Sequence, residues 1–249
     1  MEEKNPSAAE VFAALKASTL TDLSITVHTE TLICRIPKST GLQRRVGPCV
    51  CPGMKSEVYK FVCGFGTHID SPAHFNPEEG FYRVHSLPLG MLVCPGVVID
   101  ISERAAENPD TELYIKDIEE WEEKFGMIPE GAFVVMRSGW DLKVNDEVAY
   151  MNRSEELGRC RFPGYSVDAA LFLHEKRKVA GIGTDGICID SGIRFLKNED
   201  VHKLLLKHNM FFMELMYLVD VPKRPCTMIV APVNVRDAPE TPTRILAIS

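Results

Sequence analysis

The chain has 249 residues, of which 45% are hydrophobic and 25% are charged, a composition typical of a globular protein with a substantial core. Its formal net charge of −7 at pH 7 argues against a nucleic-acid partner. No secretory signal is visible after Met1, and the most apolar window, Met210 to Val221, contains Glu214 and is too short to cross a bilayer. We therefore expect a cytoplasmic protein without a membrane partner, whose eight cysteines are reduced thiols.

The N-terminal part of the sequence predicts one helix, one strand and a long loop. Ser7 and Glu10 form a capping box, which predicts a helix that continues to about Lys16. β-Branched residues alternate with others over Leu20–Thr29, and this pattern predicts a strand. Residues 37–55 are rich in glycine, proline and basic residues and show little periodicity. We expect a long loop there, and such a loop could close over a site.

Apolar runs and helical periodicity alternate along the rest of the chain. The expected strands cover Met91–Ile101, Ala132–Arg137, Val179–Asp185, Phe211–Val219 and Thr227–Val235. The expected helices are Lys116–Phe125, a helix capped by Ser166, and Asn198–His208. This alternation predicts the α/β class. Because no linker or internal repeat divides residues 1–249, we expect a single domain.

The stretch Gly64–His74 carries the strongest chemical signal. Pro72 excludes a helix interior and favours extended backbone just before it. Side chains alternate along an extended segment, so His68 and Asp70 point the same way, with His74 close behind. An imidazole and a carboxylate on one face are typical ligands of a divalent cation. The alternative is a turn whose histidines are ordinary surface or hydrogen-bonded residues.

A second pair of candidate ligands lies more than a hundred residues downstream. Glu214 interrupts an apolar run, where an isolated buried charge would cost several kcal/mol. A divalent cation would remove that cost; a partner arginine or a carboxylate at a sheet edge is the alternative. His202 lies beside Val201, Leu204 and Leu205 in the expected helix, so we expect it to face inward.

Two further motifs are weaker. Gly181–Gly186 has the spacing of a dinucleotide-binding fingerprint, but the residues that follow it do not open a helix. Cys49 and Cys51 could in principle bind metal, but the sequence has no second cysteine pair with suitable spacing. We therefore expect neither nucleotide binding nor a zinc finger.

The segment Gly66–His74, with the pattern Gly-Thr-His-x-Asp-x-Pro-x-His, resembles the signature of the cyclase family of metal-dependent hydrolases. This family includes bacterial kynurenine formamidases and isatin hydrolases. The resemblance extends over nearly the whole chain. Its other blocks are Thr21–Ser24, Leu87–Leu89, Val97–Ile101, Ser138–Trp140, Phe162–Ser166, Gly181–Asp185 and Pro242–Arg244.

The resemblance implies a fold, a site and an assembly. The family fold is a swivelling β/β/α domain that usually forms homodimers or higher homo-oligomers. Position by position, His68, Asp70, His202 and Glu214 match the family's metal ligands, and His74 matches its catalytic histidine. The expected cofactor is a divalent metal, zinc or manganese.

One departure from the family pattern affects the metal site directly. The signature opens with a further metal-binding histidine, and Gly64 stands at that position. We therefore expect one ion rather than two. Gly186, where threonine is usual, and the segment 237–241 also differ from the pattern. A catalytically impaired member that binds a small molecule or acts as a scaffold is the alternative.

The activity implied by the resemblance is hydrolysis of the C–N bond of a small amide or formamide, arylformamidase-like, with N-formylkynurenine as a candidate substrate. The metal would activate water, and His74 would act as general base and then as general acid. Four aromatic residues could line an apolar substrate pocket, although each could equally belong to the core: Phe65, Phe75, Phe81 and Trp140.

Overall fold

The computed structural model describes residues 5–29, 31, 42–48 and 51–249, and its centre is a β-barrel. Seven strands close it, because the last strand of the row also pairs with the first. In spatial order they are β14 (Glu240–Ile248), β13 (Cys226–Pro232), β5 (Val93–Asp100), β7 (Phe133–Arg137), β11 (Gly181–Thr184), β12 (Phe211–Glu214) and β4 (His68–Asp70). An eighth strand, β1 (Leu20–Asp22), pairs with the C-terminal end of β14.

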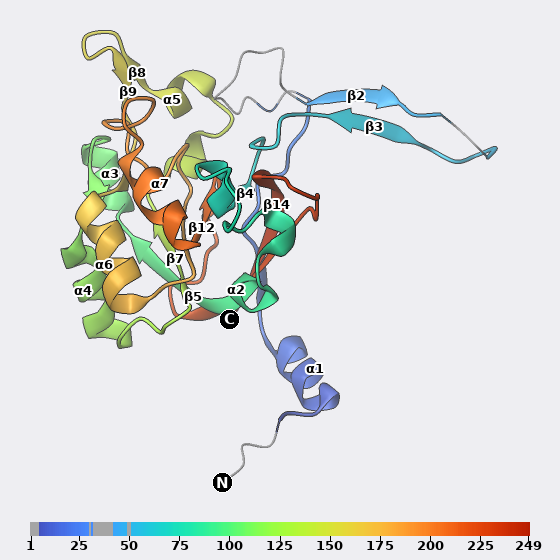
Figure 1. The fold of residues 1–249 in the computed structure, drawn as a ribbon, viewed down its shortest axis with the longest axis horizontal. Helices are drawn as coiled ribbons and strands as arrows, with labels where there is room; N and C mark the ends of the chain where they lie inside the picture. Colours follow the sequence, from blue (N-terminus) through green and yellow to red (C-terminus); the bar gives the residue numbers. More distant parts are fainter. Residues whose placement is uncertain (1–4, 30, 32–41, 49–50) are drawn as a thin grey trace.

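Parallel strands form one half of the barrel, and helices cover them on the outside (Figure 1). Strands β5, β7, β11 and β12 run parallel to one another. The chain returns between them through α3 (Ser102–Glu107) and α4 (Ile115–Phe125), then α6 (Val167–Arg177), then α7 (Asp200–Leu205). This is the expected α/β class.

Two apolar clusters follow from the alternation of side chains along these strands. The barrel interior holds side chains such as Ile69, Phe133 and Phe211, all of which are fully buried. The alternate residues, such as Phe212, face the helices and pack with Leu205 of α7. A residue on the helix-facing side of a strand is therefore covered by a helix and excluded from the barrel interior.

The remaining elements are short. They are α1 (Ala8–Ala17), α2 (Leu89–Leu92), α5 (Glu147–Met151), β2 (Gln43–Val46), β3 (Glu57–Lys60), β6 (Glu112–Leu113), β8 (Arg153–Ser154), β9 (Arg159–Cys160) and β10 (Gly164–Tyr165). Among the described residues, no helix combines the length and apolar character that a membrane span requires.

The predicted elements exist, but several boundaries were wrong. The first strand ends at Asp22 instead of Thr29. Helix α7, predicted to begin at Asn198, begins at Asp200, because its N-cap, Glu199, has a left-handed φ of 47°. Strand β12 ends at Glu214, since φ of Leu215 is 56° and extended pairing stops there. Such backbone turns at non-glycine residues leave no clear pattern in the sequence.

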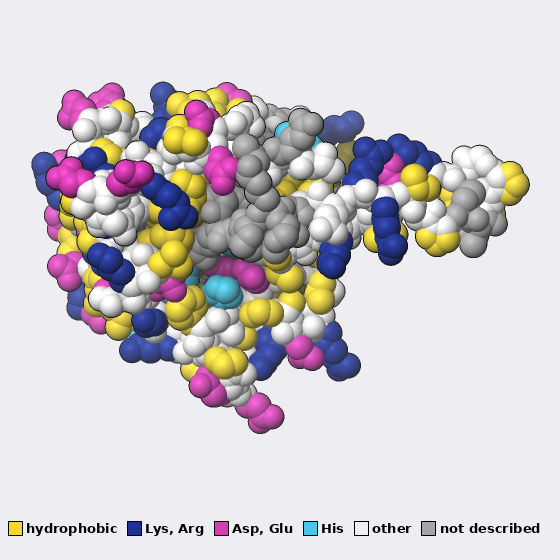
Figure 2. Space-filling view, turned by 90° about the horizontal axis from the view of Figure 1, so that it is seen from above, with side chains coloured by type: hydrophobic (Ala, Val, Ile, Leu, Met, Phe, Trp, Pro, Cys, Tyr) yellow, Lys and Arg dark blue, Asp and Glu magenta, His cyan; other side chains and the backbone are white. Residues whose placement is uncertain are grey.

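Two segments project from the body of the molecule (Figure 1). Helix α1 has the predicted capping box and buries none of its residues. Strands β2 and β3 form a hairpin where a loop was expected, and Lys and Arg side chains line it (Figure 2). Residues 37–41 of that loop, its possible closure over a site, and Cys49 of the cysteine pair lie outside the described residues.

Replacing Phe133 with alanine tests the packing of the barrel interior. The Phe133 side chain is fully buried, and its ring lies 5.2 Å from that of Phe211. Removing it leaves a cavity, so we expect a loss of about 3–5 kcal/mol in the free energy of unfolding, measured by urea denaturation. Met127→Ala, at a side chain that is 75% exposed, serves as the control. Equal stability of the two variants would contradict this packing.

Candidate metal centre

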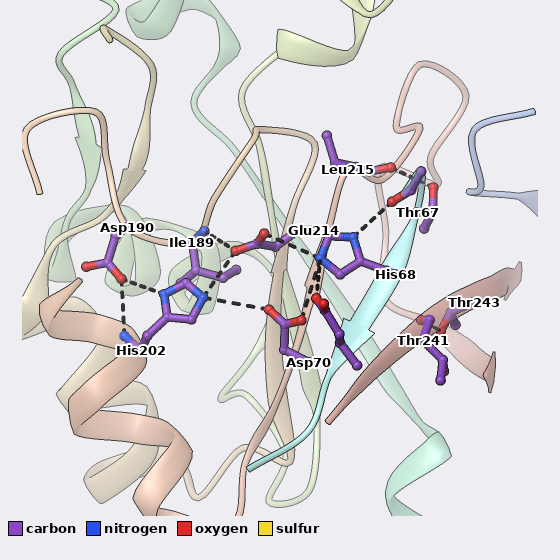
Figure 3. A network of polar contacts seen from close by, with 12 residues as sticks. Thr67, His68, Asp70, Ile189, Asp190, His202, Glu214, Leu215, Thr241 and Thr243 are labelled. Atoms are coloured by element: carbon purple, nitrogen blue, oxygen red, sulfur yellow. Dashed lines mark hydrogen bonds and ion pairs between the residues drawn. The ribbon is translucent and has the colours of Figure 1, made fainter. Parts of the chain in front are cut away.

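Strand β4 places its two candidate ligands between two other strands of the barrel. His68 lies opposite Glu214 of β12, and Asp70 lies opposite Glu240 of β14. The alternation along each strand turns all four side chains to the same, outer side of the barrel. The short strand that closes the barrel therefore also assembles a cluster of one imidazole and three carboxylates (Figure 3).

Helix α7 adds the second imidazole from outside the barrel. The Nε2 atom of His202 lies 3.2 Å from Oε1 of Glu214 and 3.7 Å from Oδ2 of Asp70. Its Nδ1 atom donates a hydrogen bond of 2.6 Å to Asp190, which also accepts the backbone N–H groups of Val201 and His202. Asp190 thereby fixes the ring so that Nε2 faces the cluster.

His68 is oriented in the same manner. Its Nδ1 atom donates to the carbonyl oxygen of Gly66 at 2.9 Å, which leaves Nε2 directed at the carboxylates. The Nε2 atom lies 3.5 Å from Oδ1 of Asp70, 3.6 Å from Oε2 of Glu214 and 4.0 Å from Oε2 of Glu240. Each histidine thus presents one nitrogen as a possible ligand and uses the other to hold its orientation.

Burial makes this cluster costly unless a cation joins it. His68, Asp70, His202 and Glu214 are at most 2% exposed. Within the described part of the chain, neither carboxylate oxygen of Asp70 nor Nε2 of His202 has a hydrogen-bond partner. Buried polar atoms without partners are rare in proteins, and a divalent cation would satisfy several of them at once. The residues present therefore fit a metal ion.

Electrostatics point the same way. Burial tends to raise the pKa of Asp70, but electrostatic interactions with His74, His68 and His202 outweigh this effect and hold that pKa well below its usual range. Burial tends to lower the pKa of His202, yet contacts with Cys188, Asp190 and Asp70 raise it. Negative charge in the cluster thus attracts positive charge, which a metal ion can supply in place of protons.

His74 lies next to the cluster, on the 3₁₀ turn that follows β4. Its ring centroid is 6.4 Å from that of His202 and 5.2 Å from that of Phe75. Phe75 in turn lies 5.0 Å from the His202 ring. Among the described residues, no protein group forms a hydrogen bond with the His74 ring. The geometry therefore leaves its nitrogens available for a substrate or water.

The other three aromatic candidates lie elsewhere around the site. Phe65 is buried, with its ring 6.1 Å from Phe61, and lines a cavity beneath the N-terminal segment. Trp140 is buried in a core cluster, and its indole N–H donates to the carbonyl oxygen of Tyr150. Phe81 is partly buried. Their substrate contacts stay a prediction.

Sequence reasoning missed three groups that belong to this centre. Asp190 was not among the candidate site residues, yet its carboxylate accepts a hydrogen bond from the His202 ring. Cys188 lies with His202 and Glu214 in a group whose ligand atoms are within 4.8 Å of one another, and Glu240 forms a similar group with His68 and Asp70. The segment around Glu240 departs from the family pattern, and this departure was the only available signal for it.

Comparisons with known proteins confirm the fold expected from the sequence. The family model "Putative cyclase" matches residues 21–191. The isatin hydrolase of Roseibium aggregatum is 33% identical over 190 residues, which cover 74% of this chain and 70% of that protein.

Two solved structures extend the likeness to the whole chain. Isatin hydrolase A from Labrenzia aggregata, bound to benzyl benzoate, is 27% identical with a TM-score of 0.87. An isatin hydrolase bound to the product analogue thioisatinate is 26% identical, also with a TM-score of 0.87. Each alignment covers 98% of this chain and 99% of the other.

Replacing Asp190 with asparagine tests how the centre is supported. The amide removes the negative charge behind His202 and cannot accept all three N–H groups that Asp190 binds. We expect metal affinity to fall about 10–100-fold, measured by calorimetric titration of the metal-free protein with Mn²⁺ or Zn²⁺. Asp117→Asn, which breaks an ion pair between Asp117 of α4 and Arg104 of α3, should leave that affinity unchanged. Unaltered binding by Asp190→Asn would refute the supporting role.

Proposed function

The chain belongs to the cyclase family, and from this membership we propose that it is a metal-dependent hydrolase that cleaves the C–N bond of a small amide. The observation that carries the proposal is the convergence of His68, Asp70, His202 and Glu214 in one buried cluster (Figure 3), in which, among the described residues, the Asp70 oxygens and Nε2 of His202 have no hydrogen-bond partner.

His68, Asp70, His202 and Glu214 would hold a divalent ion, zinc or manganese. Bound there, the ion would supply Lewis acidity, which polarises a carbonyl and lowers the pKa of a water from 15.7 toward ~7. The protein's own contribution is to fix the donors. Gly66 and Asp190 hold the two imidazoles from behind, and burial keeps competing water away from Asp70.

His74 is the group placed to move the proton. As general base it would accept a proton from the attacking water, and as general acid it would return that proton to the leaving nitrogen. The C–N bond then breaks to give a carboxylate and an amine. Such proton transfer typically contributes ~10²–10⁴-fold to the rate. The position of the His74 ring, beside His202 and without a protein partner in the described chain, supports this role.

The substrate class follows from the relatives and from the aromatic residues at the site. The similar proteins are isatin hydrolases, one of them bound to the product analogue thioisatinate. Phe75, whose ring adjoins both His74 and His202, offers an apolar surface for an aromatic substrate. We therefore propose an N-aryl amide, with isatin and N-formylkynurenine as the compounds to test. We also propose that the protein is cytoplasmic and forms homo-oligomers.

A catalytically impaired protein is the second candidate, and Gly64 is the observation that favours it. Metal analysis separates the two. An enzyme should retain a divalent ion after purification or regain it from added Mn²⁺ or Zn²⁺. Less than about a tenth of an equivalent, not recovered by adding metal, would favour the impaired protein and contradict a metal site of useful affinity.

Replacing His74 with alanine tests the proposed chemistry. We expect kcat for isatin or N-formylkynurenine to fall by ~10²–10⁴-fold, because the proton carrier is lost, while the metal content stays that of the wild type. His208→Ala, at an exposed histidine outside the centre, should change neither quantity. Loss of metal together with activity would instead assign His74 as a metal ligand.

A further inference from the structure

Gly64 has no side chain, and the carboxylate of Glu240, from strand β14, occupies the space beside it. A Cβ atom built on Gly64 would lie 2.8 Å from Oε2 of Glu240 and 3.4 Å from Nε2 of His68. The backbone of Gly64 lies outside the left-handed region, so its conformation does not require glycine. The nearest obstacle to a larger residue at position 64 is the Glu240 carboxylate, which would have to move to make room for it.

We propose that Glu240 is a metal ligand that takes the place left open at Gly64, so that His68, Asp70 and Glu240 form one complete donor group. This inference rests on the proposed function only in that the centre binds a divalent ion. It adds a ligand from β14, an element from which the sequence predicted none.

The distances support this donor group. The ligand atoms of His68, Asp70 and Glu240 all lie within 4.8 Å of one another, and Nε2 of His68 lies 4.0 Å from the Glu240 carboxylate. Donors that share a tetrahedral ion at ~2.1 Å lie ~3.4 Å apart, so small rotations of these side chains suffice. The register fixes the approach, because Glu240 lies directly opposite Asp70.

The charges require a cation at this place. Asp70, Glu214 and Glu240 surround His68 within 4.0 Å of its Nε2 atom. Asp70 is fully buried, and neither of its oxygens has a hydrogen-bond partner in the described part of the chain. The Glu240 side chain is 23% exposed. An extra carboxylate placed beside Asp70 is repulsive unless a positive charge lies between them.

Using Glu240 as a ligand in place of a histidine at position 64 also changes which metal the centre prefers. A histidine at position 64, together with His68 and Asp70, would offer the ion two nitrogen ligands and one oxygen ligand. Glu240, together with His68 and Asp70, offers one nitrogen ligand and two oxygen ligands. Carboxylate oxygens suit Mn²⁺, and imidazole nitrogens suit Zn²⁺ relatively better. We therefore expect the ratio of the Mn²⁺ affinity to the Zn²⁺ affinity to be higher in this chain than in a variant that carries the histidine.

Calorimetric titration of the full-length, metal-free protein with Mn²⁺ and with Zn²⁺ tests the inference. Glu240→Gln keeps the size of the side chain and removes its charge, and we expect the affinity for Mn²⁺ to fall at least tenfold. Glu78→Gln, at an exposed residue, is the matched control and should bind like the wild type. Far-UV circular dichroism shows whether each variant is folded.

If Glu240→Gln folds poorly, variants that place a histidine at position 64 provide a second test. Gly64→His alone should bind no more tightly than the wild type, since its side chain meets Glu240. Gly64→His combined with Glu240→Ala should regain most of the lost affinity and shift the preference toward Zn²⁺ by at least threefold.

The outcomes separate the inference from the proposed function. A wild-type protein that binds neither metal would overturn the proposed function and the inference with it. A wild-type protein that binds metal while Glu240→Gln binds equally well would overturn the inference alone. The second result would assign Glu240 to an ordinary ion pair with His68.

Discussion

The three-residue strand β4 is the constraint on which the site depends. It pairs with β12 on one side and with β14 on the other, and these pairings close the barrel. The same register puts His68 opposite Glu214 and Asp70 opposite Glu240, so closing the barrel and assembling the cluster are one event. Folding must therefore bring carboxylates together in a buried place, and a cation lowers the free energy of that arrangement.

The packing of β4 in the barrel explains why the side chain of Asp70 has a fixed position. Its neighbour in β4, Ile69, is fully buried in the barrel interior and fixes the strand from the other side. Asp70 then has no freedom to turn toward solvent, and its oxygens face the two imidazoles. The hydrophobic effect at one residue thus sustains a costly polar arrangement at the next.

The sequence predicted those site residues whose polar or charged side chains are unusual among their sequence neighbours. A glutamate inside an apolar run required an explanation, and the structure places Glu214 in the cluster, with His202 from α7 beside it. The α/β class followed from the alternation of strands and helices. Glu240 lies in a polar segment, and Asp190 lies at the end of a short apolar run that resembles a turn in sequence, so their roles depend on contacts between distant strands and helices. Single-sequence patterns do not contain those contacts.

Gly64 and Glu240 show how a site can change its donors while keeping its shape. The two positions are far apart in sequence but share one volume beside His68, so a long side chain at position 64 would displace the Glu240 carboxylate. Exchanging a neutral imidazole for a carboxylate adds a negative charge to the donors. A more negative donor set neutralises more of a divalent ion's charge and leaves less to polarise a substrate. A protein with this exchange would therefore depend more on a well-placed base, which is the role we propose for His74, whose ring lies beside the cluster.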